Sequence, residues 1–79
     1  MARKIEWTRH ARRRMRQRHV TEEEVRQALS QPDHTASDSE GDPVSFRRFA
    51  DGVIVKVAYV VEADVHVIKA VVSRPGRSG

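Results

Sequence analysis

The chain has 79 residues, which is enough for one small domain and too few for two. It contains no cysteine, so disulfides and thiolate metal sites are excluded, and no apolar run approaches the roughly 20 residues that a membrane-spanning helix needs. Eight Lys/Arg and one Glu give residues 1–20 a charge of +7, seven acids and one Arg give residues 21–45 a charge of −6, and residues 46–79 carry +3.

The first predicted helix starts after Thr8, which is a good N-cap, and runs to about Arg18. Ala11 and Met15 lie four residues apart on it and continue the line from Trp7. This spacing predicts one narrow apolar stripe that faces inward.

The second predicted helix has an unusually complete start signal. Thr21 and Glu24 have the spacing of a capping box, and Val20 with Val25 has the spacing of the matching hydrophobic staple. The helix is expected to end at Pro32.

The residues after Pro32 form a polar, acidic segment rich in turn formers, which predicts a loop with at most a short edge strand. Three β-rich segments follow, at Val44–Ala50, Val53–Val61 and Val65–Ser73. Asp51-Gly52 between the first two segments is a strong signal for a hairpin with a two-residue turn.

A two-residue turn pairs Ala50 with Val53, and a second such turn at Ala63-Asp64 joins the last two strands. The predicted core face then carries Val44, Phe46, Val53, Val55, Val57, Ile68, Ala70 and Val72. The opposite face carries Arg47, Lys56 and Lys69 beside Phe49 and Ile54. A three-residue second turn would place Lys69 among the valines, where an unpaired ammonium group is costly, so the first register is preferred.

These elements predict an α+β fold, with two N-terminal helices packed on one face of a three- to four-stranded antiparallel sheet. The chain is expected to form a single domain over residues 1–79, with frayed ends at about 1–6 and 74–79. The Arg-rich N-terminus lacks the apolar region of a secretion signal, so it is expected to belong to the fold.

The basic ends of the chain favour RNA or DNA as a partner over an anionic membrane. The predicted nucleic-acid-binding residues are Arg47, Lys56, Lys69 and Arg74. A sheet face with cations and a phenylalanine can bind phosphates and stack a base. The alternatives are that the basic and acidic segments neutralise each other, or that this face is solvated and its lysines prevent aggregation.

A stripe of His10, Arg14 and Arg18, four residues apart, gives the predicted catalytic set. The four histidines have no metal-ligand spacing, so no metal and no cofactor are expected. RNA cleavage through the substrate's own 2′-hydroxyl needs only an acid/base and cations, which are here His10 and the two arginines. Lys56, Lys69 and Tyr59 are secondary candidates. The structural alternative pairs Arg14 and Arg18 with Glu22, Glu23 or Glu24 and lets His10 cap a strand end.

The segment "WTRHARRRMRQRHVTEEEVRQAL", followed by Pro32, resembles a family of small bacterial domains of unknown function with a T-x-H-A-x-x-R-M-x-x-R signature. The positions that match are Thr8, His10, Ala11, Arg14, Met15, Arg18, Glu24, Val25 and Leu29. That family resembles the RelE/ParE toxin superfamily. The resemblance implies a RelE/ParE-like fold and toxin or ribonuclease activity.

The resulting functional hypothesis is a toxin-type, metal-independent endoribonuclease. The alternative is a non-catalytic nucleic-acid-binding or protein-interaction module of a toxin–antitoxin-like system, with an acidic antitoxin-like protein as candidate partner. RNA is expected in preference to DNA, no membrane partner is expected, and the absence of cysteine is typical of a cytoplasmic protein.

Overall fold

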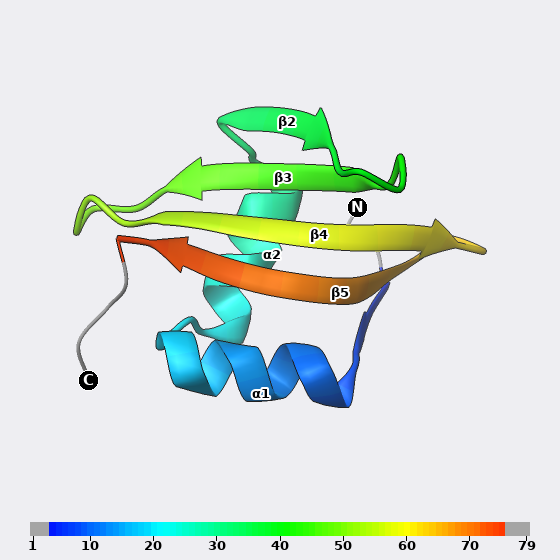
Figure 1. The fold of residues 1–79 in the computed structure, drawn as a ribbon, viewed down its shortest axis with the longest axis horizontal. Coiled ribbons are helices and arrows are strands. Elements are labelled where there is room, and N and C mark those ends of the chain that lie inside the picture. Colours follow the sequence, from blue (N-terminus) through cyan, green and yellow to red (C-terminus); the bar gives the residue numbers. More distant parts are fainter. Residues whose placement is uncertain (1–3, 76–79) are drawn as a thin grey trace.

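The computed structural model describes residues 4–75, which form one five-stranded sheet and two helices. The elements in chain order are β1 (Lys4–Trp7), α1 (Arg9–Arg18), α2 (Glu22–Ser30), β2 (His34–Ser37), β3 (Pro43–Arg48), β4 (Ile54–Glu62) and β5 (Val65–Arg74). The strand order is β1-β5-β4-β3-β2 (Figure 1). β1 pairs with β5 in parallel, and every other neighbouring pair is antiparallel.

The predicted fold class is therefore wrong. The sheet was expected to have three or four antiparallel strands, but it has five strands and is mixed. Residues 4–6, expected to be frayed, belong to β1. Since β1 precedes α1, the helices are not the N-terminal elements. Arg74 belongs to β5, while the other predicted frayed residues, except Pro75, lie outside the described residues.

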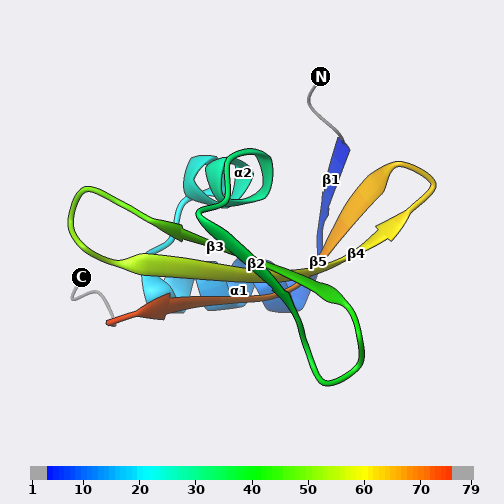
Figure 2. The same ribbon diagram turned by 90° about the horizontal axis from the view of Figure 1, so that it is seen from above.

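The helices take different positions relative to the sheet. Figure 1 shows α1 running alongside β5, and α2 crossing behind β3 and β4. In the view from above, α2 and the loop between β2 and β3 project from opposite sides of the sheet (Figure 2). We call the side of the sheet away from α2 the open face.

The predicted helix starts are confirmed. Thr8 Oγ1 accepts a hydrogen bond from the Ala11 backbone N–H and also donates to the Ile68 carbonyl, so this cap ties α1 to β5. Thr21 and Glu24 form both hydrogen bonds of the capping box. α2 ends at Ser30, two residues before Pro32.

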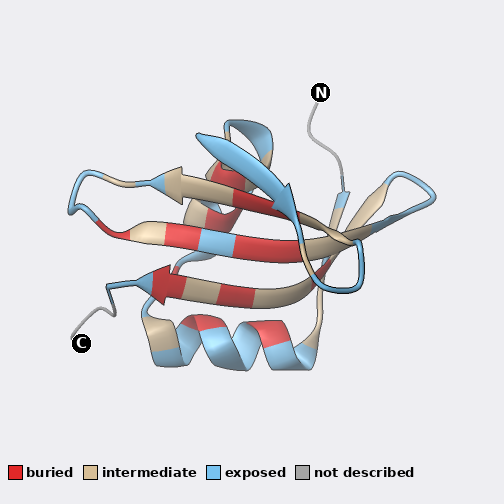
Figure 3. Ribbon diagram, turned by 45° about the horizontal axis from the view of Figure 1, so that its top comes forward, coloured by how far each residue is buried: buried red, intermediate tan, exposed pale blue. Residues whose placement is uncertain are grey.

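One apolar core joins the helices to the sheet. It contains Ala11 and Met15, the predicted inward residues of α1, and Val20 and Val25, the predicted hydrophobic staple. These residues pack against valines of β4 and against β5 (Figure 3). Its buried members are Ala11, Met15, Val20, Val25, Ala28, Val53, Val55, Val57, Ile68 and Val71. Four residues predicted for the core face, Val44, Phe46, Ala70 and Val72, are not among them, although Val44 is buried.

The difference begins at the β3–β4 turn, where the predicted two-residue register is wrong. The Phe49 backbone N–H donates to Val53 O, so three residues, Ala50 to Gly52, form the turn. Gly52 has φ +82, the left-handed conformation that follows a type I turn in such three-residue hairpins. The extra residue shifts the pairing by one, so every β3 side chain points to the face opposite from the predicted one.

The β4–β5 turn has the predicted two residues, because Glu62 pairs with Val65 and both Ala63 and Asp64 adopt positive φ. The predicted Tyr59–Ile68 pair is also confirmed. Beyond it, a β-bulge shifts the register by one residue, and Lys69 has no partner residue on β4.

Gly52 provides a test of the hairpin. A Cβ added at Gly52 would meet no atom within 4 Å, so the cost of Gly52→Ala arises from its left-handed backbone alone. We expect Gly52→Ala to lower the free energy of unfolding by about 1–2 kcal/mol in urea denaturation. Gly52→Asn should cost less, because asparagine tolerates this conformation better. Equal losses in both variants would contradict the backbone account.

Candidate nucleic-acid interface

The register brings a set of cationic and aromatic side chains together on the open face. Antiparallel partners point to the same side of a sheet, and the backbone pairs form two rows across the strands. One row pairs His34 with Phe46, Phe46 with Lys56, and Lys56 with Val72. The next row pairs Arg48 with Ile54 and Ile54 with Arg74. We call His34, Phe46, Arg48, Lys56 and Arg74 the cationic patch.

Phe46 lies at the centre of the first row. Its ring centroid is 5.4 Å from that of His34, and the Lys56 Nζ lies 5.8 Å from the Phe46 centroid. His34 and Lys56 are exposed, and Phe46 is half-buried. An aromatic ring between two groups that can carry positive charge suits a planar, anionic ligand.

The patch borders an open depression of about 720 Å³ near the β3–β4 turn. Its lining residues are Asp33, His34, Phe46, Arg47, Arg48, Phe49, Ala50 and Ile54. Asp33 fixes the start of β2 there, since its backbone N–H donates to Phe46 O and its Oδ2 accepts from the Arg48 N–H at 2.7 Å. These bonds hold the backbone beside His34 and Arg48 in place.

Arg47, predicted to bind nucleic acid, lies on the α2 side of the sheet. Its Nη1 donates to the Gln31 carbonyl at the C-terminus of α2, at 2.6 Å, and its guanidinium lies 5.7 Å from the Phe49 ring centroid. A cation at this helix end is electrostatically favourable. Arg47 Nε is buried without a hydrogen-bond partner. The residue is thus used within the fold, and it lies on the side of the sheet opposite to Lys56.

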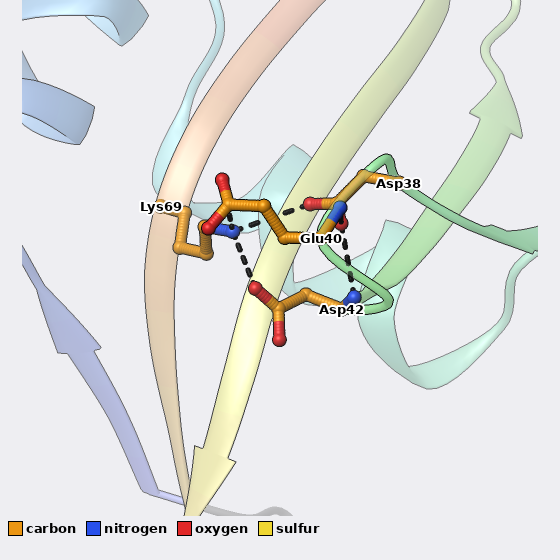
Figure 4. A network of polar contacts seen from close by, with 4 residues as sticks. All are labelled: Asp38, Glu40, Asp42 and Lys69. Carbon is orange, nitrogen blue, oxygen red and sulfur yellow. Dashed lines mark hydrogen bonds and ion pairs between the residues drawn. The ribbon is translucent and has the colours of Figure 1, made fainter.

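Lys69 lies on the open face but is neutralised by the loop between β2 and β3 (Figure 4). Its Nζ is 2.5 Å from Asp42 Oδ2, 3.2 Å from Asp38 Oδ2 and 3.6 Å from Glu40 Oε1. The Lys69 side chain is only 27% exposed. The hydrogen bond from Lys69 to Asp42 is the main factor that raises the pKa of Lys69 above 10.5.

The same loop stabilises the ionised form of Asp38. The backbone N–H of Asp42 donates to Asp38 Oδ1 at 2.9 Å, and this bond, with Lys69, holds the pKa of Asp38 below 3.8. Three carboxylates therefore surround one ammonium group, and this end of the open face is acidic rather than basic.

The predicted stripe of His10, Arg14 and Arg18 lies on one flank of α1 and is not part of the cationic patch. His10 and Arg14 are exposed, and Arg18 is half-buried. Among the ion pairs of the described residues, none joins Arg14 or Arg18 to Glu22 or Glu23. It is Arg12 that bonds Glu22, at 2.8 Å, and Thr8 rather than His10 that bonds the β5 backbone.

Of the seven predicted site residues, the structure places Lys56 and Arg74 in the patch. The predicted site lacks His34, because the short edge strand allowed after Pro32 had no predicted register. It lacks Phe46 and Arg48, because a two-residue turn places both on the core face. The sequence signal for a three-residue turn is the glycine in its third position, Gly52, which suits the left-handed residue of that hairpin type.

Within residues 4–75, no helix is long and apolar enough to cross a membrane. The same described part of the chain holds no group of three or more His, Cys, Asp or Glu side chains placed to bind a metal ion. In comparisons with known proteins, the model of a family described as a domain of unknown function, DUF4258, matches residues 7–73. No curated protein and no solved structure matches the chain.

The acidic loop yields a prediction about stability and pH. Lys69→Met should lower the melting temperature at pH 7, because three carboxylates then lose their shared cation. Asp38 has a depressed pKa, so its contribution is present above pH 3.8 and is lost as pH falls through its folded-state pKa. The difference between variant and wild type should therefore shrink below about pH 4. Lys69, whose pKa is raised, contributes fully below pH 10.5.

The control for this measurement is Lys56→Met, which removes the same charge from the neighbouring strand, where the lysine is exposed. Melting curves at pH 3, 5 and 7 compare the two variants. An equal loss in both at pH 7, or a Lys69→Met difference that persists at pH 3, would contradict the stabilising role of the ion cluster.

Proposed function

We propose that this chain, which belongs to the DUF4258 family, binds single-stranded RNA on the open face of its sheet. The observation that carries the proposal is the row in which Phe46 lies between His34 and Lys56. It places one aromatic ring and two groups that can bear positive charge on neighbouring strands, open to solvent on one side.

The charges of the patch support an anionic ligand. Arg48, Lys56 and Arg74 are exposed, and within the described residues their side chains form no ion pair. Arg12 and Lys69, by contrast, are paired with carboxylates. These three cations lie in the same two rows of the open face as Phe46. Phosphate groups are the ligands that such lysines and arginines neutralise in RNA.

The aromatic ring favours a single strand over a duplex. A base can stack on Phe46 only if it is not enclosed in a helix, and single-stranded RNA is recognised on open sheets in this way. The stacking energy is typically about 1–3 kcal/mol per base. Phosphate contacts would then fix the strand, and the stacked base would add affinity without strong sequence preference.

Salt titration of RNA binding tests the proposal. Wild-type protein should bind a single-stranded oligonucleotide with an affinity that falls steeply between about 50 and 200 mM salt. Lys56→Gln should weaken binding and reduce the slope of log affinity against log salt by about 0.7, the value of one contact to a single strand. Fluorescence anisotropy with a labelled oligonucleotide measures both quantities.

The matched control is Arg26→Gln, which removes one charge from the α2 side, where Arg26 lies 5.8 Å from the Trp7 ring centroid. It should leave the slope unchanged. If both variants bind equally, net charge rather than the patch determines affinity. No binding at low salt would refute the proposal.

A second candidate function, metal-independent RNA cleavage, is supported by the α1 stripe. His10 and Arg14 are exposed one turn apart, and neither is used in an ion pair within the described residues. The resemblance of the chain's family to the RelE/ParE toxin superfamily, inferred from the sequence, suggests the same chemistry. His10 would accept the proton of the 2′-hydroxyl as its oxygen attacks phosphorus. The P–O5′ bond breaks, water protonates the leaving oxygen, and the imidazolium returns its proton to solvent.

Cleavage is tested with purified protein in excess EDTA, with RNA ends mapped as 2′,3′-cyclic phosphates. If wild type cleaves, His10→Ala should reduce the rate about 10²- to 10⁴-fold, the usual contribution of one acid/base group. The melting temperature should be nearly unchanged, since the side chain is exposed. The control is Arg13→Gln, an exposed residue of α1 outside the stripe, which should cleave as wild type does. Full activity of His10→Ala would exclude the stripe as the catalytic site.

A further inference from the structure

The flank of α1 that carries His10, Arg14 and Arg18 faces away from α2. Ala11 and Met15 of the same helix are buried against the sheet. On the other flank, Arg12 pairs with Glu22 of α2 and lies 5.6 Å from the Trp7 ring centroid. Residues 10, 14 and 18 follow a line one turn apart on the opposite side of the buried stripe. They are therefore directed away from α2, as the open face is.

This flank meets the sheet at the end of β5. α1 runs alongside β5 (Figures 1 and 3), and Ser73 Oγ donates to the Arg18 carbonyl at 3.4 Å. The residue after Ser73 is Arg74, which belongs to the cationic patch and pairs with Ile54. The backbone at the C-terminal end of the α1 stripe thus lies beside β5, one residue before Arg74.

The spacing of the cations suits a flexible chain of phosphates. Successive stripe residues are about 6 Å apart along the helix axis, and neighbouring strands in the patch lie about 4.8 Å apart. The patch supplies an aromatic ring, but the stripe supplies only charge and hydrogen-bond donors. Contacts of the latter kind position a nucleic acid without reading its bases.

We infer that the stripe and the patch form one continuous track for a single strand of RNA. An unpaired base stacks on Phe46, and the phosphates beyond Arg74 lie along Arg18, Arg14 and His10. The inference rests on the proposed function, because it assigns the direction in which the bound strand leaves the sheet. The track turns from the sheet onto a helix, a path that a flexible single strand can follow more readily than a stiff duplex.

The experiment measures affinity against oligonucleotide length, using oligouridines of 3 to 12 nucleotides. The key pair is Arg14→Gln and Arg13→Gln, because these neighbouring exposed arginines of α1 carry the same charge. Arg14 lies in the stripe, whereas Arg13 points away from the buried side of the helix. Arg14→Gln should weaken binding of the long oligonucleotides about threefold or more and reduce their salt slope by about 0.7. The shortest ones should bind it as they bind wild type.

Arg13→Gln should match wild type at every length, while Lys56→Gln should weaken binding at all lengths. If Lys56→Gln weakens binding but Arg14→Gln and Arg13→Gln act alike, the track ends at the patch, and the inference fails while RNA binding by the sheet stands. If Lys56→Gln has no effect, the proposed function itself fails. A duplex or a DNA strand that binds as tightly as RNA of the same length would overturn the assignment of the occupant to single-stranded RNA.

Discussion

The turn between β3 and β4 contains three residues, and this length determines on which side of the sheet each β3 side chain lies. With Gly52 in the left-handed conformation, Arg47 pairs with Val55 and points toward α2, while Phe46 pairs with Lys56 on the open face. A turn one residue shorter would exchange these faces. The aromatic centre of the cationic patch and the arginine at the C-terminus of α2 thus depend on one backbone geometry.

The acidic middle of the chain neutralises particular cations and leaves others unpaired. Glu22 bonds Arg12, and the loop between β2 and β3 surrounds Lys69. Both contacts lie outside the patch. Folding therefore decides which cations are neutralised, because each carboxylate pairs with a cation that is near it in space and not with one that is near it in sequence. An RNA strand would be attracted to the patch and repelled from the acidic loop beside it.

Thr8 links the elements that position the α1 stripe. Its hydroxyl caps α1 and donates to Ile68 O, at the point where β1 ends beside β5. α1 then runs along β5 until Arg18 meets Ser73. Because both ends of α1 are bonded to the same strand, the orientation of the helix, and with it the flank that carries His10 and Arg14, is fixed relative to the sheet.

The sequence by itself determined both helices, their N-terminal caps, the buried side of α1, and the existence of two hairpins, because these depend on local periodicity and on side chains a few residues apart. It also located Lys56 and Arg74 in a cationic surface. Tertiary structure decided the pairing of β1 with β5, which joins residues 61 apart, and the side on which β3 presents Phe46. A strand of four residues has no periodic signal of its own, and a register depends on backbone dihedrals at one glycine. Both are settled only when the strands pack.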